Sequence, residues 1–354
     1  MTPRKAALAI AVIALSLTAC TKEEPKSLFD KDMAFNFKKD TPEADATGNS
    51  PGSSLATPAV NPTGPVQFIR SIKSTSRQVA VDQLSQGNFY ESIVSEVEGY
   101  RAQIYSDNIG YAIGNGWNVS LQGRGTNEKV GQAIGLPPSQ VASLASLSSM
   151  AAVQALPVVS ISPEQAIKAT QVMRAQFEEP IRGLVGANLY DKLQPHQKAA
   201  LSYHVYKVGP TGAAKFTKLI TAVQAYAINS VPELAKKAAE QFTYTYKLNG
   251  KVYEDKRSTL YLASLFTDPK AYGYLLGTTA APANFSSIAK IAGQKIDTKR
   301  PADDQINDDF GAAKEKLFEQ GIAPTIELDV NWKAMPKIVM VPAYQPTGFY
   351  SNPN

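Results

Sequence analysis

Hydrophobic residues recur with helical spacing over much of the chain between residues 88 and 276. Phe89, Ile93 and Val97 lie four positions apart and so share one face, which predicts a helix from residue 88 to about residue 104. Residues 196–208 and 216–227 show the same amphipathic period, and we expect helices there too. The block from 162 to 276 is therefore predicted to be mostly helical.

Short motifs indicate where individual elements begin and turn. Ser162-Pro163-Glu164-Gln165 combines a serine N-cap, a proline at the first helical position and a glutamine that can complete a capping box, so a helix should start there. Ser230-Val231-Pro232-Glu233 predicts a second helix start. Glycines interrupt an alternating stretch from 110 to 119, which favours a small sheet. Asn249-Gly250 indicates a turn, which we expect between two helices.

The N-terminus has the pattern of an export signal. A basic pair at residues 4 and 5 precedes an unbroken apolar run, Ala6–Leu15, that is too short to span a bilayer. The run leads into Leu17-Thr18-Ala19-Cys20, which resembles the lipobox of bacterial lipoproteins, where lipid is attached to the cysteine before cleavage. Cys20 is the only cysteine, so a free thiol or an intermolecular disulfide is the alternative. We expect residues 1–19 to be removed and Cys20 to carry lipid.

Composition divides the remaining chain into a tether, a domain and an extension. Residues 20–87 are expected to form a flexible tether, because the polar, Pro- and Gly-rich part up to about residue 64 buries too little apolar surface to fold. Apolar residues near 68–72 hint at a short helix before the domain, which we place at 88–276. Residues 277–354 form a C-terminal extension with a predicted helix at 309–320 and a β-branched run at 325–330.

Charge and histidine content exclude two classes of function. The formal net charge is +5, without a dense run of Lys and Arg, so a nucleic-acid groove is not expected. The two histidines, His196 and His204, lie on one predicted helix without a nearby carboxylate or cysteine cluster. We therefore predict no metal site. Gly123-Arg124-Gly125 lacks the strand, the third glycine and the acidic residue that a dinucleotide site needs, and no cofactor is expected.

The stretch from Glu98 to Gly116 carries the most specific motif. It reads Glu-Gly-x-Arg-x-x-x-Tyr-x-Asp-x-x-Gly and is followed by Gly-x-Gly. This pattern resembles the active-site segment of phage lysozymes of the T-even type, glycoside hydrolase family 24, in which a helix ends with Glu-Gly and a hairpin follows. The segment Val208–Phe216 resembles the family's glycine-containing turn after a buried helix, so the likeness covers about residues 88–276.

The resemblance implies an α+β, mainly helical, lysozyme-like fold with a small β-hairpin or sheet beside the active-site helix and a larger helical lobe. It also implies inverting hydrolysis of the β-1,4 bond between N-acetylmuramic acid and N-acetylglucosamine. Such cleavage needs one carboxylic acid to protonate the leaving oxygen and a second carboxylate to activate water. We expect Glu98 to be the acid and Asp107 the water-activating carboxylate. The alternative is that Glu98 pairs with Arg101 and that Asp107 belongs only to a turn.

The sequence also departs from the family's pattern. Ala112 occupies the position of a threonine that helps to hold the attacking water, and a methyl group cannot hydrogen-bond water. Trp117 stands where a histidine is usual, and the loop from Gly110 is one residue shorter. We expect Tyr105, Asn115 and Trp117 to contact the glycan.

Two rival interpretations follow from these departures and from the extension. One is a lysozyme-like lipoprotein that has lost hydrolysis and binds peptidoglycan or an envelope partner; the other is a structural part of a virion or an envelope complex. The expected partners are peptidoglycan, a membrane through lipid on Cys20, and an envelope or virion protein at residues 277–354. Thr21 after the lipidated cysteine favours the periplasmic face of the outer membrane in a host with two membranes.

Overall fold

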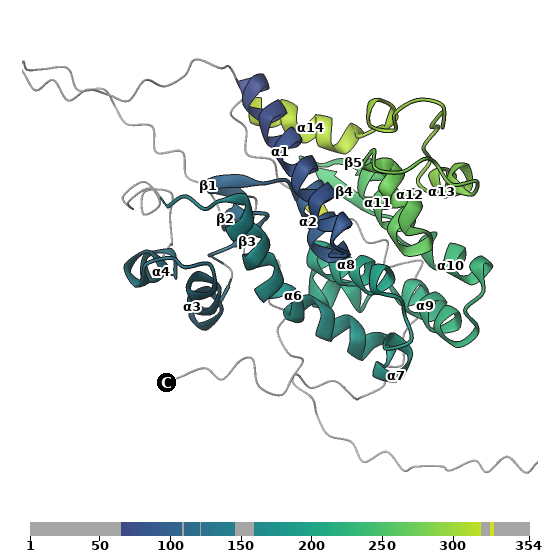
Figure 1. Cartoon of the computed structure of the whole chain (residues 1–354), viewed down its shortest axis with the longest axis horizontal. Helices are drawn as coiled ribbons and strands as arrows, with labels where there is room; N and C mark the ends of the chain where they lie inside the picture. The colour runs from purple at the N-terminus through teal and green to yellow at the C-terminus, as the bar shows by residue number, and fades with distance from the viewer. Residues whose placement is uncertain (1–64, 108–109, 121, 146–158, 320–325, 329–354) are drawn as a thin grey trace, which may run out of the picture. The chain divides into compact units, whose positions relative to one another are not determined.

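Helices dominate the part of the chain that the structure describes, and two small antiparallel sheets accompany them (Figure 1). The structure, a computed structural model, describes residues 65–107, 110–120, 122–145, 159–319 and 326–328. The prediction of a mainly helical α+β fold is confirmed at this level. Cys20 and the predicted signal peptide lie outside the described residues.

The helices are α1 (Pro65–Ser85), α2 (Phe89–Glu98), α3 (Arg124–Ala133), α4 (Pro138–Ala145), α6 (Pro163–Val185), α7 (Ala187–Tyr190), α8 (Pro195–Ala213), α9 (Thr217–Asn229), α10 (Pro232–Ala239), α11 (Lys256–Thr267), α12 (Pro269–Leu275), α13 (Phe285–Ile291), the 3-10 helix η1 (Asp303–Gln305) and α14 (Asp309–Glu319). The strands are β1 (Arg101–Asp107), β2 (Gly110–Gly114), β3 (Trp117–Asn118), β4 (Thr245–Leu248), β5 (Lys251–Glu254) and β6 (Ile326–Leu328). One sheet has the order β1-β2-β3 and the other β5-β4-β6.

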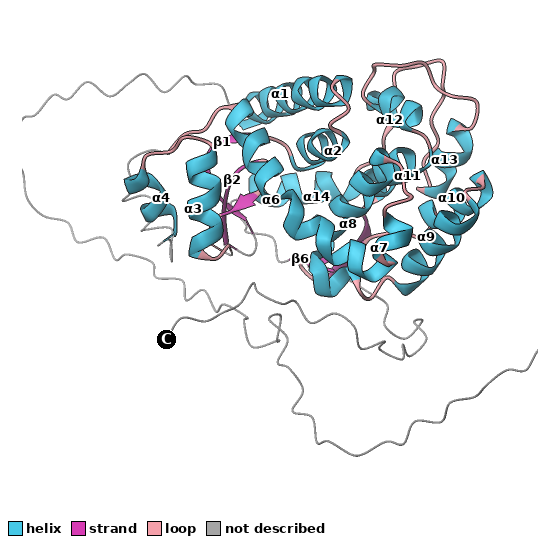
Figure 2. Cartoon of the chain, turned by 60° about the horizontal axis from the view of Figure 1, so that its bottom comes forward, coloured by secondary structure: helices cyan, strands magenta, loops and turns pink. Residues whose placement is uncertain are grey.

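The first sheet forms a small lobe with α3 and α4 (Figure 2). Its core contains Ile113 and Trp117 from the sheet, Val130 from α3 and Leu144 from α4, all of them buried. This arrangement confirms the small sheet expected from the alternating stretch at 110–119. Helix α4 is described as far as Ala145, and residues 146–158 lie outside the described part of the chain.

Helix α6 joins the small lobe to the larger helical lobe. Its start has the predicted capping box, because the Gln165 N–H donates to Ser162 Oγ at 3.2 Å and the Ser162 N–H donates to Gln165 Oε1 at 2.9 Å. Ala166 near this start belongs to the core of the small lobe, whereas Ile181 and Val185 near the end belong to the large core. One continuous helix therefore fixes the sheet against the helical lobe.

Helix α2 lies inside the large lobe, where α1, α6 and α8 pack around it. It ends at Glu98, six residues before the end that periodicity predicted. Gly99 follows with φ 79°, a left-handed conformation that glycine adopts at little cost, and this residue turns the chain out of the helix and into β1. The predicted boundary was wrong because Ile104 continues the apolar spacing of the helix although it lies in a strand.

Two further differences concern the limits of the domain, and a third concerns a turn within it. Helix α1 lies in the range assigned to the tether, and its Ala80 is fully buried in the large core. The turn at Asn249-Gly250 joins strands β4 and β5 rather than two helices. The extension contributes Phe285 and Phe310 to the same core. The packed unit thus extends beyond residues 88–276 on both sides, since these flanking segments cover apolar surface that the central helices leave open.

His204 on α8 is fully buried among aromatic rings. Its imidazole lies 4.6 Å from the Phe216 ring centroid, and its Nδ1 is 2.8 Å from the hydroxyl of Tyr244. Burial, together with the nearby Lys207 ammonium, lowers the pKa of His204 to about 3. The native state therefore keeps this histidine neutral.

We expect the free energy of unfolding to fall as the pH decreases from 6.5 towards 3, because the unfolded chain then binds a proton at His204 that the native state does not. One such group accounts for about 3 kcal/mol between pH 7.5 and pH 4.5, at roughly 1.4 kcal/mol per pH unit. Urea unfolding at the two pH values measures the loss. His204→Leu should reduce this difference, and an equal difference in the variant would contradict the assignment.

In the described part of the chain, no helix combines the length and the hydrophobicity needed to cross a bilayer.

Candidate active site at the end of α2

The candidate acid, Glu98, is the last residue of α2 and its side chain is exposed. The hydroxyl of Tyr203 on α8 donates a hydrogen bond of 2.5 Å to Glu98 Oε1. Among the described residues, no other side chain hydrogen-bonds to this carboxylate. Tyr203 of α8 thus holds one carboxylate oxygen, while the residue as a whole remains exposed to solvent.

Tyr203 is suited to orient the carboxylate. It is fully buried, and its ring stacks on that of Tyr206 at 5.8 Å between centroids. Burial raises the pKa of Tyr203 well above its ordinary value, and the neighbouring charge of Glu98 raises it further. The hydroxyl therefore remains protonated near neutral pH and keeps its role as donor.

Tyr206 fixes the turn between β2 and β3 beside the same helix. Its hydroxyl donates to the carbonyl oxygens of Asn115 and Gly116, at 3.1 Å each. Gly116 has φ 86°, and a Cβ there would lie 2.0 Å from the Tyr206 oxygen, so no other residue fits without displacing the tyrosine. The Asn115 amide donates to Ser95 on α2 at 3.0 Å, which ties this turn to the helix that carries Glu98.

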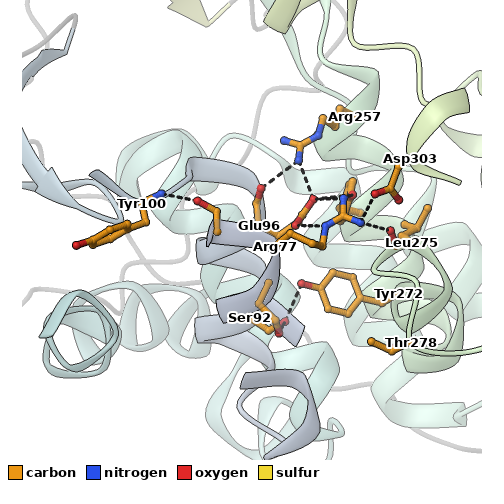
Figure 3. Close-up of polar contacts among 12 residues, drawn as sticks. Arg77, Ser92, Glu96, Tyr100, Arg257, Tyr272, Leu275, Thr278 and Asp303 are labelled. Atoms are coloured by element: carbon orange, nitrogen blue, oxygen red, sulfur yellow. Dashed lines mark hydrogen bonds and ion pairs between the residues drawn. The ribbon is translucent and has the colours of Figure 1, made fainter. Parts of the chain in front are cut away.

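A buried network holds the last turns of α2 in place (Figure 3). Glu96 is 6% exposed and receives two hydrogen bonds from Arg77 of α1, each of 2.7 Å. Arg257 and Tyr261 of α11 both donate to Glu96 Oε1, at 2.9 and 2.8 Å. Arg77 also reaches Asp303 at 2.6 Å. Because these groups come from α1, α11 and η1, segments remote in sequence converge two residues before Glu98.

A second buried ion pair involves Lys207, which lies one turn after Tyr203 on α8. Lys207 Nζ is 2.8 Å from Asp255 Oδ2 and donates to Ser258 Oγ at 3.0 Å. Asp255 also caps α11, because the Ser258 N–H donates to its Oδ1 at 2.9 Å. Burial alone would raise the pKa of Asp255, but Lys207 and the hydrogen bonds from Ser258 lower it to about 2. The pair is therefore charged and mutually compensated.

The second candidate carboxylate, Asp107, is the last residue of β1. Its backbone pairs with Gly110 across the hairpin that follows α2, and its side chain lies outside what the structure describes. Ala112 pairs with Tyr105 on one side and with Asn118 on the other, and its methyl group is fully buried. The position expected to hold water thus offers no polar atom of its own.

The three residues expected to bind glycan have different surroundings. Tyr105 is half-buried and lies beneath the guanidinium of Arg101, 4.3 Å from its ring centroid. Asn115 is buried in the turn described above. Trp117 is 1% exposed, and its indole N–H donates to Asn127 of α3 at 2.9 Å. Trp117 is therefore a core residue of the small lobe and presents no surface to a ligand.

Sequence reasoning missed Tyr203, Lys207 and the Glu96 network. The two α8 residues fall within an apolar helical pattern, so nothing local distinguishes them from core and surface positions. The described residues contain no group of His, Cys, Asp and Glu arranged to hold a metal ion. The shallow depression between the end of α3 and the start of α6 involves none of the residues around Glu98.

No protein-family model, curated protein or solved structure matches the chain.

Proposed function

We propose that this chain is a peptidoglycan hydrolase that cleaves the β-1,4 bond between N-acetylmuramic acid and N-acetylglucosamine. The observation that supports it best is the position of Glu98: an exposed carboxylate at the end of a buried helix, hydrogen-bonded to one buried hydroxyl and closely followed by strand β1, which ends at Asp107. This arrangement suits a proton donor facing a glycan, with Asp107 as the second carboxylate.

In this proposal each residue has a distinct role. The free oxygen of Glu98 delivers the proton to the leaving glycosidic oxygen, and Tyr203 fixes the orientation of the carboxyl group through the other oxygen. Asp107 activates the attacking water on the opposite face of the sugar. Lipid on Cys20 would hold the exported protein at a membrane, on the periplasmic face of the outer membrane where the host has two membranes.

A second candidate function is glycan binding without cleavage. The buried methyl group of Ala112 favours it, because no hydroxyl is available there to help position water. In this alternative the chain still binds peptidoglycan, and only the hydrolysis of the glycosidic bond is absent.

One assay separates the two functions. The purified full chain is incubated with peptidoglycan sacculi, and new reducing ends and soluble muropeptides are measured. Hydrolysis predicts products with a hydrated muramic acid at the reducing end, released first as the inverted anomer. Sacculi that bind the protein and yield no new reducing ends would overturn the enzymatic proposal in favour of binding.

A further inference from the structure

Helix α14 of the C-terminal extension is anchored in the large core beside the second sheet. Phe310 is 4% exposed and stacks on Tyr246 of β4, with 4.8 Å between ring centroids and 10° between their planes. Leu317, two turns later, packs against the same core. The position of α14 is thus set by apolar packing.

Lys314 is one turn beyond Phe310 on this helix. Its ammonium lies 4.6 Å from the Phe310 ring centroid, and the side chain is half-buried. Among the described residues, no carboxylate forms an ion pair with it, whereas Lys207 nearby is neutralised by Asp255. A half-buried cation without an ion-paired carboxylate is unfavourable, and an anionic ligand would relieve this cost.

A continuous set of contacts connects Lys314 to the region of Glu98. The Phe310 ring stacks on Tyr246, and the Tyr246 ring centroid is 5.4 Å from Lys207 Nζ. Lys207 follows Tyr203, the partner of Glu98, by one turn of α8, so the two share a helix face.

The electrostatic neighbours of Lys314 agree with this path. Burial and the Lys207 ammonium lower the pKa of Lys314, whereas the charges of Asp255, Glu98 and Asp308 act in the opposite direction. Glu98 is therefore within electrostatic range of Lys314.

We propose that Lys314 is a substrate-binding residue that recognises a carboxylate on the muramyl residue of the glycan strand, and that the C-terminal extension is thereby part of the active site. This inference rests on the proposed function and adds a specificity to it. A neutral polymer of N-acetylglucosamine lacks such a carboxylate. A muramyl residue carries one on its stem peptide or, where the peptide has been removed, on its lactyl group.

The test measures binding in the Glu98→Gln background of the full chain, so that the glycan stays intact. Lys314→Met keeps most of the apolar stem and removes the charge, Lys314→Arg restores a cation, and Lys316→Met on the exposed side of the same helix is the matched control. Co-sedimentation is measured with intact sacculi, with glycan strands stripped of peptides by an amidase, and with chitin.

Lys314→Met should weaken binding to sacculi or to stripped strands by about tenfold, the ratio given by 1.4 kcal/mol. Its binding to chitin should be unchanged, Lys316→Met should bind like the parent, and Lys314→Arg should recover most of the affinity. A larger loss with intact sacculi identifies the stem-peptide carboxylate as the ligand. A larger loss with stripped strands identifies the lactyl carboxylate.

Equal binding by Lys314→Met and Lys316→Met would overturn the role of Lys314 alone and leave the proposed function intact. A parent chain that binds none of the glycans would overturn both.

Discussion

Replacing Glu98 with glutamine is expected to lower the rate of glycan cleavage by about 10²–10⁴-fold, the usual contribution of a general acid. Glutamine can still accept the hydrogen bond from Tyr203 through its carbonyl oxygen, but it carries no proton to deliver. The rate is measured as new reducing ends released from sacculi, under conditions that saturate the protein with substrate.

The matched control for this variant is Glu254→Gln on β5, a carboxylate that is 69% exposed and remote from Tyr203 in the sequence. It should retain the parent rate. A Glu98→Gln chain that keeps a tenth or more of the parent rate would remove Glu98 from the chemistry. Binding to sacculi should be the same in all three chains, because the substitution alters proton transfer and leaves the shape of the site unchanged.

Glu96→Gln is expected to destabilise the folded chain by about 3 kcal/mol, since it leaves the guanidinium groups of Arg77 and Arg257 without their buried counter-charge. This figure is at the lower end of the range for breaking a buried pair, because each arginine side chain retains 24% exposure and water can reach it. Urea or thermal unfolding measures the loss.

Glu128→Gln provides the comparison for an exposed ion pair. Glu128 pairs with Arg124 on the surface of α3, where the two side chains are 43% and 80% exposed. We expect this variant to change the free energy of unfolding by less than about 0.5 kcal/mol. Similar losses in both variants would show that the convergence on Glu96 adds nothing to the fold.

The sequence predicted correctly those elements that are determined by residues close together in the chain. The capping box at Ser162 and the alternation before Val119 depend on neighbours a few residues away, so these predictions were accurate. The end of α2 was placed too late, because hydrophobic spacing ignored the single glycine that ends the helix. Periodicity identifies faces better than ends.

Long-range contacts explain what the sequence could not provide. Glu96 meets Arg77 nineteen residues away and Arg257 at a separation of 161 residues, and no local pattern links them. Trp117, one of the two aromatic residues expected to contact the glycan, is in the core, whereas Tyr203, which no motif marks, contacts Glu98. Which aromatic side chain faces the carboxylate depends on how α8 packs against α2, and that is a property of the assembled core.

The pairing of β6 with β4 limits where the chain can be truncated without damage to the fold. β4 lies between β5 and β6, so ending the chain before Ile326 leaves one side of β4 with unsatisfied backbone donors and acceptors. A shorter chain ending near residue 277 also loses Phe285 and Phe310, and with them part of the hydrophobic interior. Such a truncation exposes a strand edge that can pair with other chains. Aggregation or mislocalisation of the truncated chain would therefore report a damaged fold rather than the loss of a docking module.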